Sequence, residues 1–285
     1  MELAPRVSVV IPVYNQADFL REAIASVIAQ TYRDFELIVV DDGSTDSSGD
    51  VARSADPGVR VIRQENQGVS AALNAGIRAA RGEWISILNA DDLWEPAKLQ
   101  CQMAVVDRHP EAAFLYTDYR IIDAEGRIIR DLPCPAPDGR EAKRVELLKG
   151  CYINTDTVLI RRAVLDEVGL FLEREGYAPD YDLWLRIAAR YEPWRVPDFL
   201  VRYREHGGQT SRRRRAMVQA TYRVLGRHLR REPLGIGFRV LGCRMWQEVV
   251  WTLRRVRTKR SWEELLDRAG VHIDALRLLV NPEAT

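Results

Sequence analysis

The first ninety residues alternate between runs of apolar, mostly β-branched positions and segments in which apolar residues recur at helical spacing. The strand-like runs are 7–12, 35–40, 59–62 and 84–88. The two helical stripes are Leu20, Ile24, Val27 and Ile28, and Val69, Leu73, Gly76 and Ile77. Near-continuous apolar strands separated by amphipathic helices predict a parallel sheet with helices on both faces, so we expect an α/β fold.

A different pattern follows residue 92. Pro96 suits the first turn of a helix that continues to His109, because proline fixes a helical φ where no N–H is needed. Residues 113–118 predict a strand, and 119–130 predict a hairpin with β-branched arms. We therefore expect a second, mixed portion of sheet, followed by a helix that starts at Asp180.

The formal net charge of +1 conceals a strong asymmetry. Residues 202–260 carry 17 Arg and Lys against 3 Glu, whereas residues 1–201 carry 23 Arg and Lys against 33 Asp and Glu. The pattern beyond 211 is arginine-rich and helix-like, with no strand signal. We therefore divide the chain into a domain over 1–211 and a basic, mainly helical extension over 212–285, which would suit an acidic partner.

The four cysteines show no CxxC pair and no regular spacing, which argues against a disulfide framework or a structural zinc site. The apolar run near the N-terminus is too short for a signal peptide or a membrane span and predicts the first strand instead. We expect a protein of the reducing cytoplasm.

Polar residues collect where three of the predicted strands end. These tails are PVYN (12–15), DDGS (41–44) and NADD (89–92). If the strand order is the common 3-2-1-4, the tails line one crevice at the carboxyl ends of the strands, where such sheets bind ligands. The adjacent carboxylates Asp91 and Asp92 repel each other, so we expect a compensating positive charge beside them.

Four stretches of the chain form a recognisable set: SVVIPVYN with VVDDGSTD, ENQGVSAALNAG with WISILNADD, YDLWLRIA, and YREHGGQTS. Together, over residues 6–211, they resemble family 2 glycosyltransferases, which have the GT-A fold. The resemblance implies transfer of a sugar from a nucleotide-diphosphate donor to a hydroxyl group, with inversion at the anomeric carbon.

The resemblance also implies which residues bind the nucleotide-sugar donor. Asp42 would accept a hydrogen bond from the nucleobase, which favours uracil or thymine, and Asn89 takes the first position of the family's DxD element. The family often has Arg where Leu73 stands. Alternatively, DDGS is only a turn before a helix cap. The implied donor-binding residues are Pro12, Val13, Tyr14, Asp42, Asn66, Gly68, Asn89, Ala90 and Asp92.

A divalent metal, Mn²⁺ or Mg²⁺, is implied as the cofactor. Carboxylate oxygens are the ligands such cations prefer, and the cation would offset the charge of the leaving diphosphate. Asp91 is implied as the main ligand, joined by His206 from a loop that Gly207 and Gly208 would let move. The alternatives are that NADD merely caps the next helix and that His206 is a surface residue.

An inverting transfer needs a general base for the acceptor hydroxyl. Asp180 matches the aspartate of the family's Glu-Asp pair, although Pro179 precedes it here. At a helix N-terminus, the dipole and free N–H groups would favour its ionised form. A capping role is compatible with catalysis, and Asp182, the next carboxylate, is the runner-up with a more structural character.

We therefore expect a metal-dependent inverting glycosyltransferase that uses a UDP- or dTDP-sugar in cell-surface polysaccharide or glycolipid biosynthesis. The acceptor is a saccharide, a lipid-linked molecule or another hydroxyl compound, with Asn154 and Arg161 as acceptor-side candidates. One alternative is a non-catalytic nucleotide-sugar-binding protein. Another is a processive polysaccharide synthase, which the lack of a membrane span and a QxxRW-like motif disfavours.

The basic extension has several readings. Its arginines could form a solvated helical face, or contact another protein or a second copy of the chain. Phe238, Trp246 and Trp251 among the arginines of 212–260 also suit a helix lying at the inner face of a membrane. Nucleic acid is the least favoured partner, because no known binding fold accompanies the charge.

Overall fold

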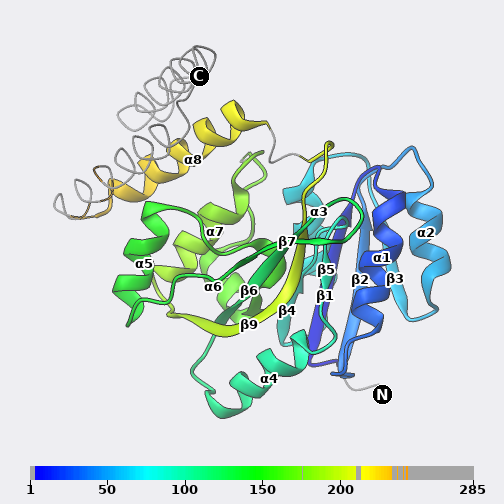
Figure 1. Ribbon diagram of the computed structural model, residues 1–285, viewed down its shortest axis with the longest axis horizontal. Helices are drawn as coiled ribbons and strands as arrows, with labels where there is room; N and C mark the ends of the chain where they lie inside the picture. Colours follow the sequence, from blue (N-terminus) through cyan, green and yellow to red (C-terminus); the bar gives the residue numbers. More distant parts are fainter. Residues whose placement is uncertain are drawn as a thin grey trace.

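A mixed sheet of nine strands runs through the molecule (Figure 1). The computed structural model describes residues 4–174, 176–209 and 213–232, together with 236, 240 and 242. Four parallel strands form one half of the sheet in the order β3-β2-β1-β4, which confirms the order expected from the sequence. They are β1 (Val7–Val13), β2 (Phe35–Asp41), β3 (Val59–Arg63) and β4 (Trp84–Ile87).

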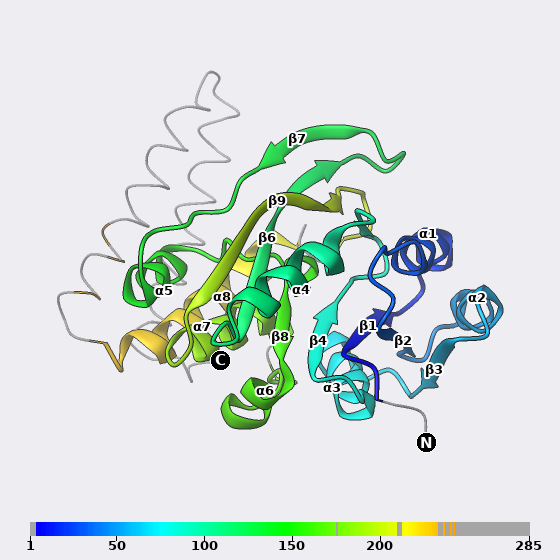
Figure 2. The same ribbon diagram turned by 90° about the horizontal axis from the view of Figure 1, so that it is seen from below.

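The second half of the sheet continues from β4 in the order β8-β6-β9-β5. Strand β8 runs antiparallel to both β4 and β6, so the mixed portion joins the parallel half without a break. The predicted hairpin is present as β6 and β7, and Figure 2 shows it reaching beyond the main body of the sheet. These strands are β5 (Leu93–Trp94), β6 (Phe114–Ile122), β7 (Ile128–Leu132), β8 (Leu159–Arg161) and β9 (Pro193–Arg204).

The sheet separates two hydrophobic cores, because alternate residues of a strand point to opposite faces. Val9 and Leu37 pack with α1 (Ala17–Ile28), α2 (Ser48–Ala55) and α4 (Lys98–Arg108). Their neighbours Val10 and Ile38 belong to the second core. That core includes α3 (Val69–Ala79), α5 (Arg140–Lys149), α6 (Arg162–Val168) and α7 (Pro179–Ala188).

Helix α8 (Arg214–Leu229) lies against the α5–α7 side of the molecule, away from α1 and α2 (Figure 1). Its residues Ala220, Val224 and Leu225 are buried in the same core as α7. The beginning of the basic segment is therefore packed against the α/β domain, and a domain boundary at 211/212 stays a prediction. Most of 212–260, including Trp246 and Trp251, lies outside the described residues.

None of the helices within the described residues is both long and apolar enough to cross a membrane.

Candidate active site

A cleft of about 1080 Å³ opens at the carboxyl ends of the parallel strands. The tails of β1, β2 and β4 all contribute to it, as expected from their positions in the sheet. The structure brings every residue of the predicted site into this one cleft: Pro12, Val13, Tyr14, Asp42, Asn66, Gly68, Asn89, Ala90, Asp91, Asp92, Asp180 and His206. Asn154 and Leu73 also line it.

Asp42 joins the end of β2 to the start of α3. Its carboxylate accepts hydrogen bonds from the backbone N–H groups of Gln67 (3.0 Å) and Gly68 (2.8 Å) and from the side-chain amide of Gln64 (2.8 Å). Gly68 has φ of 88°, a left-handed conformation that glycine adopts without strain. An ionised carboxylate has about four acceptor positions, so Asp42 can accept one more hydrogen bond from a ligand.

Asn15 fixes the loop after β1 against the loop after β2. Its φ of 52° lies in the left-handed region, where asparagine is tolerated better than most residues. The side-chain oxygen accepts from the backbone N–H of Thr45 (2.8 Å), and its own N–H donates to Ser44 Oγ (3.1 Å). This contact holds the neighbouring Tyr14, which is 48% exposed, at the mouth of the cleft.

A buried carboxylate, that of Asp156, stabilises the NADD turn after β4, and the sequence patterns did not indicate it. Asp156, in a single 3-10 turn (Thr155–Thr157), accepts from the backbone N–H (2.5 Å) and the side-chain amide (3.0 Å) of Asn89. Asn89 can donate this second bond because it is an amide, whereas an aspartate there would repel Asp156. The departure from the DxD pattern therefore has a local structural reason.

Asp91 and His206 meet at the cleft. His206 Nε2 lies 2.9 Å from Asp91 Oδ2, and each side chain is 12% exposed. The imidazole ring also packs against Phe19, with ring centroids 4.7 Å apart. Buried Arg204 fixes the turn from the other side, because its Nε donates to the carbonyl of Asp91 (2.9 Å).

Asp92 is buried behind Asp91. Its Oδ1 accepts from the backbone N–H of Arg204 (2.7 Å), and its buried Oδ2 has no donor among the described residues. Burial, with the nearby charges of Asp156 and Asp91, raises the pKa of Asp92 well above its usual range. The raised pKa means that the surroundings favour the neutral form of Asp92, and that form would not repel Asp91.

Asp180 lies in the first turn of α7, where Pro179 occupies the first helical position. Its carboxylate accepts from the backbone N–H of Tyr181 (2.8 Å) and from Thr155 Oγ1 (3.2 Å). Burial nevertheless raises the pKa of Asp180, so desolvation outweighs these donors. We expected the helix dipole to favour the ionised form, and the larger effect here has the opposite sign.

Asp182 does not line the cleft. It forms an ion pair with Arg186 (2.8 Å), and its Oδ1 lies 3.2 Å from both Arg227 Nη2 and His228 Nε2 of α8. These partners hold the pKa of Asp182 far below its usual range, despite burial. The runner-up carboxylate thus joins α7 to α8, in keeping with its expected structural character.

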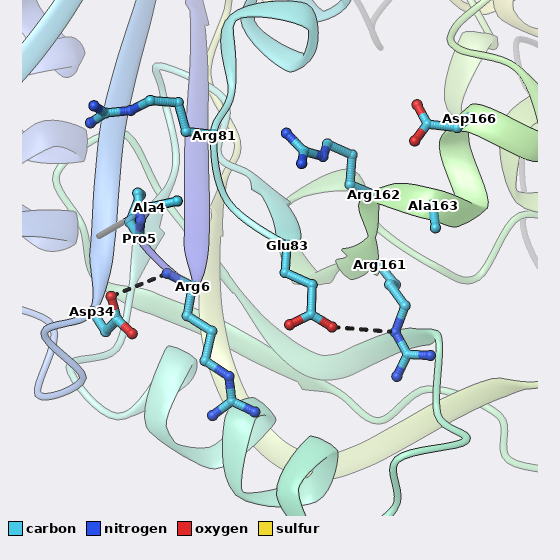
Figure 3. A pocket seen from close by; sticks show the side chains of 10 residues that line it. All are labelled: Ala4, Pro5, Arg6, Asp34, Arg81, Glu83, Arg161, Arg162, Ala163 and Asp166. Atoms are coloured by element: carbon cyan, nitrogen blue, oxygen red, sulfur yellow. Dashed lines mark hydrogen bonds and ion pairs between the residues drawn. The ribbon is translucent and has the colours of Figure 1, made fainter. Parts of the chain in front are cut away.

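A second groove, of about 490 Å³, lies where β1 and β4 begin, at the opposite end of the sheet from the cleft (Figure 3). It contains Arg161, which donates to the carbonyl of Ala112 (3.2 Å) and lies 3.8 Å from Glu83. The structure therefore does not bring Arg161 to the predicted acceptor side.

Comparison with known proteins agrees with this architecture. A family model described as glycosyl transferase family 2 matches residues 8–169. The chain belongs to glycosyltransferase family 2. The matched segment contains the strand ends that carry Asp42 and Asp91, whereas Asp180 and His206 lie beyond it.

Curated proteins of several bacteria are similar to this chain in sequence. An uncharacterised glycosyltransferase of Rickettsia prowazekii is 34% identical over 219 residues, which are 73% of this chain and 66% of the relative. The O-antigen biosynthesis protein RfbC of Myxococcus xanthus is 32% identical over 238 residues, which are 80% of this chain and 18% of the relative. The chain thus spans only part of the relatives that it matches.

Solved structures share the fold. TarS of S. aureus, residues 1–349 in complex with UDP-GlcNAc, superposes with a TM-score of 0.66 at 18% identity, covering 95% of this chain and 81% of that one. A mannosyltransferase of Pyrobaculum calidifontis in complex with GDP-Man and Mn²⁺ superposes with a TM-score of 0.64 at 18% identity, covering 99% of this chain and 88% of that one. At this identity the likeness concerns the fold, which is that of GT-A glycosyltransferases.

Proposed function

We propose that this family 2 glycosyltransferase is an inverting enzyme that transfers a sugar from a nucleotide-diphosphate donor to a hydroxyl group. One observation carries the proposal: a single cleft is lined by the residues to which we assign nucleobase binding, metal binding and proton acceptance. These are Asp42, the Asp91–His206 pair and Asp180. An inverting transfer needs such groups within reach of one donor and one acceptor.

Asp42 supports a donor with an imide N–H. Three of its acceptor positions are occupied by donors from Gln64, Gln67 and Gly68, so a fourth is left for the base. Uracil and thymine present an N–H of this kind, which favours a UDP- or dTDP-sugar. Exposed Tyr14 offers an aromatic face beside it for stacking.

Mn²⁺ or Mg²⁺ fits the Asp91–His206 pair. A carboxylate oxygen and an imidazole nitrogen can both coordinate such cations, and here they lie 2.9 Å apart in the cleft. Asp91 and His206 would supply two ligands to the cation, and the donor phosphates would supply others. A bound divalent cation would offset the charge of the leaving diphosphate.

Asp180 is the proposed base. Its pKa is raised by burial, which makes the carboxylate a stronger proton acceptor than an exposed aspartate. Thr155 and the N-terminal backbone of α7 hold both carboxylate oxygens in place. The acceptor hydroxyl would lose its proton to Asp180 as it attacks the sugar from the side opposite the diphosphate.

A donor screen tests the proposal. Purified protein is incubated with UDP-, dTDP- and GDP-sugars, with Mn²⁺, Mg²⁺ or a chelator, and release of the nucleotide diphosphate is measured. We expect metal-dependent release with at least one uridine or thymidine donor. Donor binding without any release, with every acceptor class tried, would instead favour a non-catalytic nucleotide-sugar-binding protein.

The pathway proposal rests on relatives. The similarity to a protein named for O-antigen biosynthesis supports a place in the assembly of a cell-surface polysaccharide or glycolipid. Such assembly would suit a cytoplasmic enzyme whose basic segment over 212–260 contacts the inner face of a membrane. Contact with a second copy of the chain is the other proposal for that segment.

A further inference from the structure

The cleft has a second half that the donor does not need. Its volume, about 1080 Å³, slightly exceeds the roughly 300–1000 Å³ typical of a site for one small ligand. The donor residues occupy the ends of β1, β2 and β4. The opposite wall comes from β6, β7, the loop after α5, the end of β9 and the start of α8. It includes Tyr119, Arg130, Tyr152, Tyr203, Arg213 and Met217.

The two halves differ in charge. Of the acidic residues that line the cleft, all except Asp180 belong to the donor side: Asp18, Asp42, Asp46, Asp91 and Asp92. The opposite wall carries two guanidinium groups, those of Arg130 and Arg213, and Asp180 lines the same cleft. A ligand on that wall therefore meets a positive surface beside the proposed base.

Arg130 differs from its neighbours on the hairpin. Arg120 pairs with Asp131 (3.2 Å), and Arg127 pairs with Asp123 (2.7 Å). Arg130 is exposed on β7 and forms no ion pair with any described residue. Arg130 is therefore available to form an ion pair with a negatively charged ligand.

Arg213 stands at the start of α8, where its Nη1 donates to Tyr177 Oη (3.2 Å). The first turn of α8 contains no acidic residue, and the next two residues in the sequence are also arginines. Positive side chains are unfavourable at the positive end of a helix dipole, and an anion there would reverse the sign of the interaction. This end of α8 thus adds to the charge of the same wall.

The wall also has aromatic faces. The rings of Tyr119 and Tyr203 lie edge to face, with centroids 6.3 Å apart, and both line the cleft. Aromatic side chains with a polar tip combine an apolar face for the carbon side of a sugar ring with hydrogen-bonding capacity at its edge.

We propose that this half of the cleft binds an acceptor saccharide that carries a negative charge, held by Arg130 and Arg213. The inference rests on the proposed function, since it names the substrate class of the second half of the same site. A planar guanidinium pairs with phosphate or carboxylate through two parallel hydrogen bonds. The anion is a phosphate ester of the acceptor or the carboxylate of an acidic sugar, and a neutral oligosaccharide would offer neither arginine a negatively charged partner.

The test is a ligand-observed NMR titration with UDP and Mn²⁺ present to fill the donor half. The probes are glucose 1-phosphate, methyl glucuronoside and methyl glucoside, which share one ring and differ in charge. We expect at least one charged probe to bind roughly 100-fold tighter than methyl glucoside, because each of the two arginines would contribute a charge-assisted hydrogen bond worth about tenfold. Which charged probe binds distinguishes a phosphate from a carboxylate.

Arg130→Gln and Arg213→Gln should each reduce the affinity for the charged probe about tenfold and leave methyl glucoside unchanged. Arg127→Gln is the matched control, because Arg127 lies on the same hairpin but is paired with Asp123 and does not line the cleft. Equal affinity for all three probes would overturn the inference. So would an affinity for the charged probe that Arg130→Gln and Arg213→Gln leave unchanged, or one that Arg127→Gln lowers by the same factor as they do.

Different measurements test the proposed transferase activity and the proposed anionic acceptor. Asp91→Asn should abolish metal-stimulated release of UDP while leaving the binding of the charged probe intact. Arginine-dependent probe binding without nucleotide release from any donor would overturn the proposed function alone. Metal-dependent release of the nucleotide diphosphate, together with equal affinity for charged and neutral probes, would overturn the proposal of an anionic acceptor alone.

Discussion

His206 Nε2 and Asp91 Oδ2 lie 2.9 Å apart although 115 positions separate them in the chain. The contact depends on β9, whose last residue, Arg204, bonds through its backbone to Asp92 and through its side chain to the carbonyl of Asp91. The turn after β4 and the loop after β9 therefore hold each other, and His206 follows two residues beyond that anchor.

Asp91→Asn should remove metal-dependent donor binding. The amide keeps the shape of the side chain but loses the charge that attracts a cation, so calorimetry should show donor binding that no longer responds to Mn²⁺. Asp50→Asn, an exposed change on α2 outside the cleft, is the control. Unchanged metal stimulation in Asp91→Asn would place the metal elsewhere.

Asp180→Asn should separate binding from turnover. The amide cannot accept the acceptor proton at neutral pH, so turnover should fall on the order of 10²–10⁴-fold while donor affinity persists. Steady-state rates and a donor titration on the same preparation measure both quantities. Near-normal turnover would exclude Asp180 as the base.

Thr155→Val should shift the pH dependence of the reaction. The Thr155 hydroxyl donates to Asp180 and favours its ionised form, so its removal should raise the pKa of Asp180 further. A base must be deprotonated, so the acid limb of kcat/KM should move to higher pH in the variant. Thr45→Val, at an exposed position, controls for the loss of a hydroxyl. A limb that stays in place would show that another group controls it.

Asp182→Asn should destabilise the fold by about 3 kcal/mol, because it leaves Arg227 and His228 without their buried carboxylate. The pKa of Asp182 is lowered in the folded protein, so its contribution is present above the unfolded pKa of about 3.9 and is lost as pH falls through the lower folded pKa. Urea unfolding at several pH values measures this. A difference from wild type that grows as pH falls would contradict it.

Gly76→Ala should also destabilise the folded protein, although alanine has the higher helix propensity. Alanine is ordinarily about 1 kcal/mol better than glycine inside a helix. Here, however, a Cβ would lie 2.4 Å from Val10 Cγ1 and 3.1 Å from Val40 Cγ2, because α3 presses against the sheet. Overpacking of this kind costs about 1–3 kcal/mol. Gly150→Ala, where no atom lies within 4 Å, is the control, and a stabilised Gly76→Ala would show that the sheet yields.

The sequence was sufficient for the parallel half of the fold. Strands β1 and β2 are buried on both faces, so each is a nearly continuous apolar run, and the stripes of α1 and α3 have a clear helical period. Strand β8, with three residues, is too short to carry a period, and β9 mixes buried and exposed positions without regular alternation. Both strands depend on pairing with β6, which no local pattern encodes.

For the site, the sequence indicated side chains at strand ends and, by resemblance, those of α7 and the loop after β9. Signals for others were present but weak. Asn15, a residue type that tolerates the left-handed region, follows the first strand, and Asn154 precedes Asp156 as a capping residue. Nothing local marked Arg204 or Asp156 as supports of the NADD turn. Their importance comes from burial against residues far along the chain, because a buried charge or amide requires partners that only the tertiary structure supplies.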